Sequence, residues 1–320
     1  MNLAPIILFV YNRPWHTQQT VEALQRCELA TESDLYIFAD GPKSNATDEQ
    51  KAKISEVRKY IRTIDGFLSV TIEESETNKG LANSVISGVN IIIEKYGRII
   101  VVEDDIVAHP FFLRFMNDAL DTYQEKQKIF AISATMERFS MPPNYKKNIF
   151  LTYRFGSWGW ASWVDRWNSV DWDINNYPII KHPSQKQIKN FCKGGEDLWP
   201  MLKSQARGEI DSWAIRMAYN MSLQSRYCLR PIHSFVYNIG MDSSGIHCGD
   251  KKVLLLPMYY NPFYDINLVP LKRPNKLISK NIQIVFKDNP VVRTSITKKT
   301  KRWIKRAIGI QPGKKWKLHK

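Results

Sequence analysis

Four short apolar runs, separated by helical patterns and polar turns, constrain the fold of this chain more than any other feature. Residues 5–10, 35–39, 67–72 and 99–102 are rich in β-branched and aromatic side chains, which is typical of strands. Between them, apolar residues recur with the spacing of helices that bury one face. This alternation predicts an α/β fold with a mostly parallel, Rossmann-like central sheet flanked by helices.

Charged side chains follow three of these predicted strands. Arg13 comes after the first strand, Asp40 after the second, and Glu103-Asp104-Asp105 directly after the fourth. Ligands of open parallel sheets lie beyond the carboxyl ends of the strands, so we expect these residues to form one site. The absence of GxGxxG and GxxxxGK[ST] motifs argues against a dinucleotide dehydrogenase and a P-loop NTPase.

The acidic triplet at 103–105 carries the clearest chemical signal. Three adjacent carboxylates raise one another's pKa unless a cation lies between them. Mn²⁺ or Mg²⁺, with phosphate oxygens completing its coordination shell, would satisfy them. A solvated acidic turn is the alternative, but the position after a buried strand favours a DXD-like metal site.

With these motifs in order, residues 4 to about 250 resemble glycosyltransferases of the A-type fold, in particular N-acetylglucosaminyltransferase I and its bacterial relatives. The resemblance covers about three quarters of the chain. It rests on PIILFVYNR at 5–13, the strand that ends at Asp40, VVEDDI at 101–106, PFF at 110–112, Gly159-Trp160, a downstream Asp-x-Trp and a Ser/Gly-His loop.

The resemblance implies how a metal and a donor sugar would be held. Asp105 would bind the Mn²⁺ or Mg²⁺ that bridges to the donor diphosphate, and His247 would contact the metal or the diphosphate. Asp104 would hydrogen-bond the ribose or the donor sugar, while Glu103 would lie nearer the sugar or the acceptor.

On the nucleotide side, the resemblance implies that Asp40 accepts a hydrogen bond from the uracil N–H and that Arg13 lies beside the nucleotide. Lys79 lies just before the helix on the donor side and is assigned to donor binding. Trp158 and Trp160 would line the sugar site. Glycines between large rings at 155–163 also suggest a bent segment that faces a ligand.

Asp211, in the segment EIDSW, matches the catalytic base of the family. An inverting transfer needs one carboxylate to take the proton of the acceptor hydroxyl. Asp211 is equally suited to cap the helix predicted from about Ser212 to Leu223, and the two roles are compatible. Glu209, placed in the substrate site, is the alternative base.

The positive charge of the chain is concentrated at its C-terminal end. Of the net charge of +15, eleven lysines and arginines lie between 289 and 320, where no acid occurs. Apolar residues there recur on one helical face that includes Ile296 and Trp303, which predicts a basic amphipathic segment on an anionic membrane surface. A solubilising tail and a nucleic-acid arm are the alternatives. We therefore expect a glycosyltransferase domain at 1–265 and a membrane-associating extension at 266–320.

Cysteine usage and hydropathy bear on where in the cell the protein is located. The four cysteines form no CxxC pair, which argues against a zinc ribbon. They are also too few for a disulfide scaffold, which suggests a reducing compartment. Residues 4–10 are too short for a signal peptide, and no apolar run approaches the roughly 20 residues of a membrane span. We expect a cytoplasmic protein, peripherally associated with the inner face of the cytoplasmic membrane.

Taken with the acidic triplet, the resemblance implies a metal-dependent, inverting glycosyltransferase that moves a sugar from a UDP-sugar to an oligosaccharide or lipid-linked glycan acceptor. The setting would be bacterial lipopolysaccharide, O-antigen or capsule synthesis, because eukaryotic members of the family carry a membrane anchor. A sugar-nucleotidyltransferase is one alternative, although it needs a Gly-rich basic loop where this chain has YNRP at 11–14. A non-catalytic nucleic-acid binder is the other, and we expect no nucleic-acid partner because the charge lies mainly in the tail.

Overall fold

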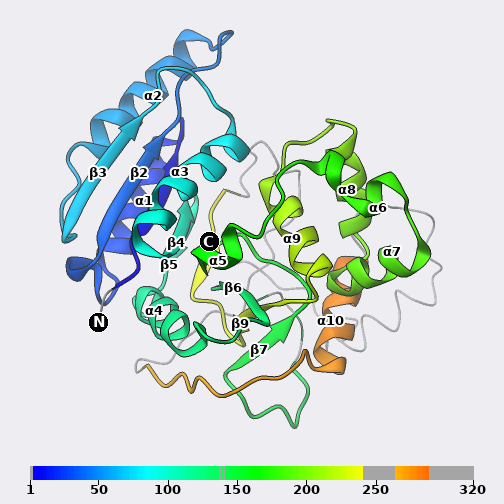
Figure 1. Ribbon diagram of the computed structural model, residues 1–320. Helices are drawn as coiled ribbons and strands as arrows, with labels where there is room; N and C mark the ends of the chain where they lie inside the picture. Colours follow the sequence, from blue (N-terminus) through cyan, green and yellow to red (C-terminus); the bar gives the residue numbers. More distant parts are fainter. Residues whose placement is uncertain (1–2, 137–138, 140, 241–263, 288–320) are drawn as a thin grey trace, which may run out of the picture.

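The computed structural model describes residues 3–240 and 264–287, apart from 137, 138 and 140 (Figure 1). His247 and the basic segment from 289 lie outside these residues, so the predictions for them stay open. Among the described helices, none is long and apolar enough to cross a membrane.

The centre of the fold is an eight-stranded mixed sheet with the order β3-β2-β1-β4-β8-β6-β9-β7. Its strands are β1 Ile6–Val10, β2 Asp34–Ala39, β3 Ser69–Glu74, β4 Arg98–Glu103, β6 Ile129–Ser133, β7 Ile149–Thr152, β8 Trp160–Trp163 and β9 Tyr227–Pro231. A separate antiparallel ladder pairs β5 Ile106–Ala108 with β10 Val236–Asn238.

Helices cover both faces of this sheet. They are α1 Pro14–Gln25, α2 Asp48–Ile61, α3 Leu81–Tyr96, α4 Phe112–Tyr123, α5 Val164–Trp167, α6 Pro178–Lys181, α7 Gln185–Phe191, α8 Leu198–Ala206, α9 Trp213–Leu223 and α10 Lys276–Lys287. Short 3₁₀ turns occupy η1 Ala30–Glu32, η2 Ile174–Asn176 and η3 Cys192–Gly194.

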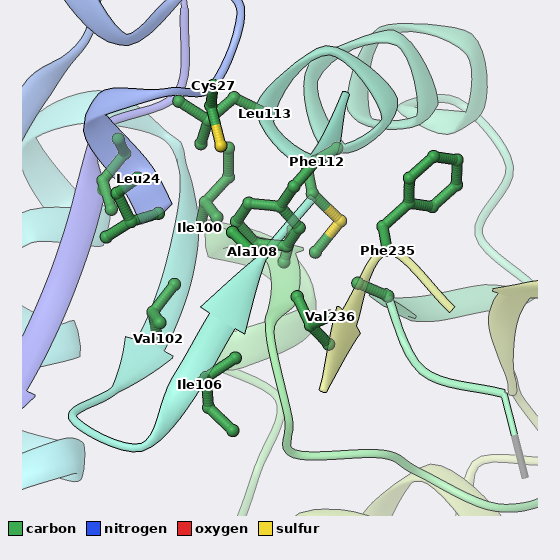
Figure 2. Close-up of a cluster of buried hydrophobic side chains, with 14 of the residues drawn as sticks. Leu24, Cys27, Ile100, Val102, Ile106, Ala108, Phe112, Leu113, Phe235 and Val236 are labelled. Carbon is green, nitrogen blue, oxygen red and sulfur yellow. The ribbon is translucent and has the colours of Figure 1, made fainter. Parts of the chain in front are cut away.

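Alternate residues of the central strands enter two separate cores. On one face, Ile100 and Val102 of β4 pack with Leu24 of α1 and Phe112 of α4 (Figure 2). On the other face, neighbouring residues of the same strand pack with α3 and α9. Glu103 continues the alternation toward the α3–α9 face, because successive strand residues point to opposite sides.

The prediction of an α/β sheet flanked by helices is confirmed. Thr47 and Gln50 form a capping box at the start of α2. The sheet is less parallel than predicted, however. Pairs β1–β2, β2–β3, β1–β4 and β6–β9 are parallel, whereas β4–β8, β6–β8 and β7–β9 are antiparallel. Parallel pairing therefore dominates the N-terminal half, where strands and helices alternate. Beyond β4, most strand pairs are antiparallel.

The segment around Trp160 differs from the bent, ligand-facing loop that the glycines suggested. Gly159 does make a bend, with φ at +58°, but Trp160–Trp163 then forms a central strand between β4 and β6. The large rings fit there because β8 is buried on both faces, so each ring enters one of the two cores.

Candidate active site

Arg13, Asp104 and Asp105 meet at the carboxyl ends of β1 and β4. The Arg13 guanidinium donates from Nη2 and Nε to the two carboxylate oxygens of Asp104, the latter over 3.3 Å, and from Nη1 to Asp105 Oδ2 over 3.0 Å. The side chains of the two aspartates are only 6% and 10% exposed. The cation that the acidic triplet requires is therefore supplied, in part, by the chain itself.

Backbone contacts from α1 and β10 fix this cluster in place. Thr20 of α1 donates from its hydroxyl to the Asp104 carbonyl over 2.9 Å, and the Ile239 N–H donates to the Asp105 carbonyl over 2.9 Å. Gly240 lies so close that a Cβ there would overlap the Asp105 carboxylate and lie 2.8 Å from Arg13 Nη1. Glycine at 240 is thus a packing requirement, and the chain reaches the site immediately before the segment that contains His247.

Burial shifts the pKa values of Glu103 and Asp104. Burial, reinforced by Asp105 and Asp104 and opposed by Arg13, raises the pKa of Glu103 to about 8. Burial also raises the pKa of Asp104, although the charge of Arg13 opposes this. Burial by itself would lower the pKa of Arg13, but attraction to Asp104 and Asp105 outweighs it, so the Arg13 pKa is raised. The arginine therefore stays charged, while burial favours the neutral form of Glu103.

Asp105 provides a possible ligand for a divalent ion. Its Oδ2 contacts Arg13, whereas its Oδ1 accepts no hydrogen bond from the residues that the structure describes. Carboxylate oxygen suits Mn²⁺ and Mg²⁺. Within those same residues, no group of three His, Cys, Asp or Glu side chains is arranged to hold a metal. The donor set thus fits an ion that takes one ligand from Asp105 and the rest from substrate, water or undescribed residues.

Asp40 organises the turn before α3. Its Oδ1 accepts from the N–H groups of Gly41 and Lys79 over 2.9 and 2.8 Å, and its Oδ2 accepts from Asn78 Nδ2 and the Gly80 N–H over 2.9 and 3.1 Å. A carboxylate offers about four acceptor positions, so these bonds use its capacity. The predicted contact with uracil would have to share an oxygen, and it stays a prediction.

The Asp40 turn is adjacent to the arginine–aspartate cluster. The Asp40 N–H donates to the carbonyl of Val10 over 3.1 Å, and Val10 is the last residue of β1, three positions before Arg13. Lys79 contributes its backbone N–H to this turn and leaves its side chain exposed. Its assignment to donor binding remains untested.

Asp211, which directly precedes the N-cap residue of α9, lies beside the same turn. A Cβ placed on Gly80 would be 3.9 Å from Asp211 Oδ2. The cap of α9 is Ser212, whose side chain accepts from the Ile215 N–H over 3.3 Å, so the alternative role of Asp211 as helix cap is wrong. Instead Asp211 Oδ1 accepts from Arg216 Nη2 over 2.9 Å, and the carboxylate is 58% exposed. It is oriented by an arginine and open to a substrate.

Glu209, the alternative base, is held differently. Arg207 donates to both of its carboxylate oxygens, over 2.5 and 2.8 Å. Hydrogen bonds from Arg207, and then from Ser204, lower the pKa of Glu209 to about 2. A carboxylate with so low a pKa is a weak proton acceptor, which favours Asp211 as the base.

The two tryptophans assigned to the sugar site occupy different environments. Trp160 is fully buried, with its ring centroid 5.7 Å from that of Trp167 and 5.1 Å from that of Trp213. It therefore has a core position and cannot contact a sugar in this structure. Trp158 is half-buried and packs against the core on the α1–α4 side, and its contact with substrate stays a prediction.

Several residues of this site were not anticipated from the sequence. Thr20, Asn78, Arg216 and Gly240 each hold a predicted site residue or approach it closely. Only Asn78 had a local signal, because Asn-Lys-Gly before an apolar helical pattern is typical of a turn that starts a helix. The contacts of Thr20 and Gly240 join segments far apart in the sequence, whereas Arg216 lies five positions after Asp211.

No protein-family model and no curated protein matches the chain. Solved structures that resemble it include a crystal structure of S. aureus TarS 1-349, with 13% identity over 74% of this chain and 60% of that one, at a TM-score of 0.41. A second crystal structure of S. aureus TarS has 11% identity over 74% of this chain and 36% of that one, at 0.38.

A third similar structure is the mannosyltransferase PcManGT from Pyrobaculum calidifontis in complex with GDP-Man and Mn²⁺. It has 14% identity over 69% of this chain and 68% of that one, at a TM-score of 0.38. The chain spans 60% and 36% of the lengths of the two TarS chains. At this level of similarity, the function has to be argued from the site itself.

Proposed function

We propose that this protein is a glycosyltransferase that uses a nucleotide-diphosphate sugar. One observation carries the proposal: the Arg13–Asp104–Asp105 cluster, the Asp40 turn and Asp211 lie next to one another in sequence-distant segments. The cluster and the Asp40 turn lie at the carboxyl ends of the parallel strands β1, β2 and β4, where such sheets bind ligands, and Asp211 approaches them from the loop before α9. The motif order that resembles A-type glycosyltransferases supports the same reading.

In this proposal Asp211 takes the proton from the acceptor hydroxyl as the sugar is transferred. Its exposure admits an acceptor, and Arg216 fixes one carboxylate oxygen while the other faces the donor side. An ionised carboxylate held in one orientation is what general-base catalysis needs. A single displacement with inversion follows from the resemblance and requires no covalent enzyme intermediate.

Arg13 and Asp105 would hold the donor diphosphate together. The guanidinium can donate to phosphate oxygens, since a planar five-donor group matches their geometry. Mn²⁺ or Mg²⁺, bound through Asp105, would neutralise charge that develops on the departing diphosphate. His247 remains a proposed second contact in the segment beyond Gly240.

The sugar-nucleotidyltransferase alternative is disfavoured by the start of α1. That helix begins at Pro14, directly after Arg13, so no Gly-rich loop can wrap a triphosphate there. The alternative of a nucleic-acid binder depends on the positive charge of the segment from 289 onward. None of the described site residues calls for a nucleic-acid ligand.

We extend the proposal to substrate and setting on the basis of the sequence resemblance. The donor would be a UDP-sugar and the acceptor an oligosaccharide or lipid-linked glycan of a bacterial surface polysaccharide, such as lipopolysaccharide, O-antigen or capsule. The enzyme would act at the inner face of the cytoplasmic membrane, bound through its basic extension. Deletion of 292–320 should then release the protein from anionic vesicles.

A donor screen by thermal shift tests the function directly. UDP-, GDP- and CMP-sugars would each be added with and without Mn²⁺. We expect stabilisation by UDP-sugars only when Mn²⁺ is present, and its loss in Asp105→Ala. If no sugar nucleotide stabilises the protein under either condition, the proposal is rejected.

A further inference from the structure

Helix α10 presents a mixed basic and apolar face to solvent. Leu277 and Ile284, seven positions apart and therefore on one side of the helix, are 59% and 40% exposed. Lys280 lies between them on the same side, and Lys276 borders it. Exposed aliphatic side chains flanked by lysines on one side of a helix give the mixed apolar and basic surface of an interfacial helix.

The opposite side of α10 explains why this face is held outward. Ile278 and Ile282 are fully buried against Met136 and Phe150, in a small core of their own. Phe286 lies under the Arg154 guanidinium, 3.4 Å from the ring centroid, and Arg154 is fixed by a bidentate ion pair with Asp197. The helix is therefore anchored by its inner side and cannot rotate to bury Leu277 and Ile284.

The charge of this face is largely uncompensated. Lys276 and Lys280 form no ion pair with any residue in the described part of the chain, whereas Lys287 lies 3.6 Å from Glu196. No acidic residue occurs in α10 itself. The chain then continues from Lys287 into a stretch with eleven basic residues and no acid after position 288.

We propose that this face of α10 docks on an anionic lipid bilayer. Lysines placed beside exposed aliphatic side chains match the boundary between charged headgroups and acyl chains. Leu277 and Ile284 would enter that boundary, while Lys276 and Lys280 would contact lipid phosphates. The inference rests on the proposed membrane setting and assigns a structured contact within the 266–320 extension, but it is independent of the donor chemistry proposed for the active site.

Vesicle flotation of the full-length protein tests this proposal. Vesicles of phosphatidylcholine with added phosphatidylglycerol are compared with pure phosphatidylcholine. Leu277→Ser with Ile284→Ser should weaken binding to the anionic vesicles about tenfold, as expected for partial loss of apolar burial. Lys276→Gln with Lys280→Gln should weaken it about 25-fold, which corresponds to roughly 1 kcal/mol for each lysine.

Matched variants elsewhere on the surface serve as controls. Ile91→Ser removes an aliphatic side chain that is 64% exposed on α3, and Lys51→Gln with Lys59→Gln removes two exposed helix lysines. Both should bind vesicles like the wild type, and urea unfolding should confirm that every variant remains folded.

Vesicle binding that is unchanged in both α10 variants would overturn the proposal. A loss confined to the lysine variant, matched by equal loss of binding to duplex DNA, would also overturn it in favour of a nucleic acid. The thermal shift with sugar nucleotides reports separately on the active site, so a failure of either proposal can be recognised.

Discussion

Arg13 gives the sharpest test of how this site is stabilised. Arg13→Met keeps most of the aliphatic volume but removes the guanidinium that pairs with Asp104 and Asp105. The two carboxylates would remain, with side chains only 6% and 10% exposed. Breaking a buried ion pair by removal of one partner typically costs about 3–5 kcal/mol, because the other charge is left without compensation.

The expected effect is therefore large compared with a surface ion pair. At about 2–3 °C per kcal/mol for a chain of this size, the melting temperature should fall by roughly 6–15 °C. Arg62→Met is the matched control, because Arg62 pairs with Glu74 at 2.8 Å but is 58% exposed. Its loss should cost less than about 1 kcal/mol.

Urea unfolding followed by tryptophan fluorescence gives both free energies. The double variant Arg13→Met, Asp104→Asn should recover part of the loss, since it removes one of the two uncompensated charges. Equal unfolding free energies for Arg13→Met and Arg62→Met would refute the view that the arginine neutralises the acidic cluster. Mn²⁺ should stabilise Arg13→Met more than the wild type if a metal can take over that role.

Three further outcomes are expected. Asp211→Asn should keep nucleotide-dependent stabilisation and lose about 10²–10⁴-fold in turnover, measured as acceptor-dependent release of nucleoside diphosphate; an active variant would remove the base assignment. Asp40→Ala should cost about 2–3 kcal/mol in urea unfolding, since four donors lose their acceptor, whereas the exposed control Asp65→Ala should cost almost nothing. Burial raises the pKa of Cys27 to about 12, so the unfolded chain releases this proton first and stability falls as the pH rises above about 9. Cys27→Ala should therefore lose stability less steeply between about pH 9 and 11, by up to about 1.4 kcal/mol per pH unit, in the same urea assay.

The N-terminal half of the fold could be predicted because its signals are local. Strands and helices alternate there, and each strand is a short apolar run. The third strand was displaced by two residues, at Ser69–Glu74 instead of 67–72. It is the edge strand of the sheet, so its exposed side accepts Glu73 and Glu74, while the apolar Leu68 remains 66% exposed outside it.

The C-terminal half was not predictable in the same way. Its strands pair across long sequence separations, such as β4 with β8 and β6 with β9, and a single sequence carries little information on such partners. Trp160 was assigned to a sugar site because aromatic rings between glycines resemble a binding loop. The same rings are also what a strand buried on both faces requires, and the sequence pattern does not distinguish the two.

The acidic triplet shows the same limit of sequence-based prediction for the candidate site. The need for a cation follows from three adjacent carboxylates, but the identity of that cation does not. Arg13 is more than ninety positions from Asp105, and only the pairing of β1 with β4 brings them together.

The position of strand β8 in the sheet has a consequence for the proposed reaction. Within the sheet it joins the half that carries the Asp40 turn to the half whose helix α9 follows Asp211, and α3 packs against α9 beside it. Its ladder to β6 is short, and the Trp160 ring, which stacks on Trp167 and packs at a tilt against Trp213, adds contacts at that junction. If Asp211 acts as the proposed base, its distance from the donor side would depend in part on this indole packing. Substitutions of these buried tryptophans would then change the distance between Asp211 and the donor side, and would thereby change turnover.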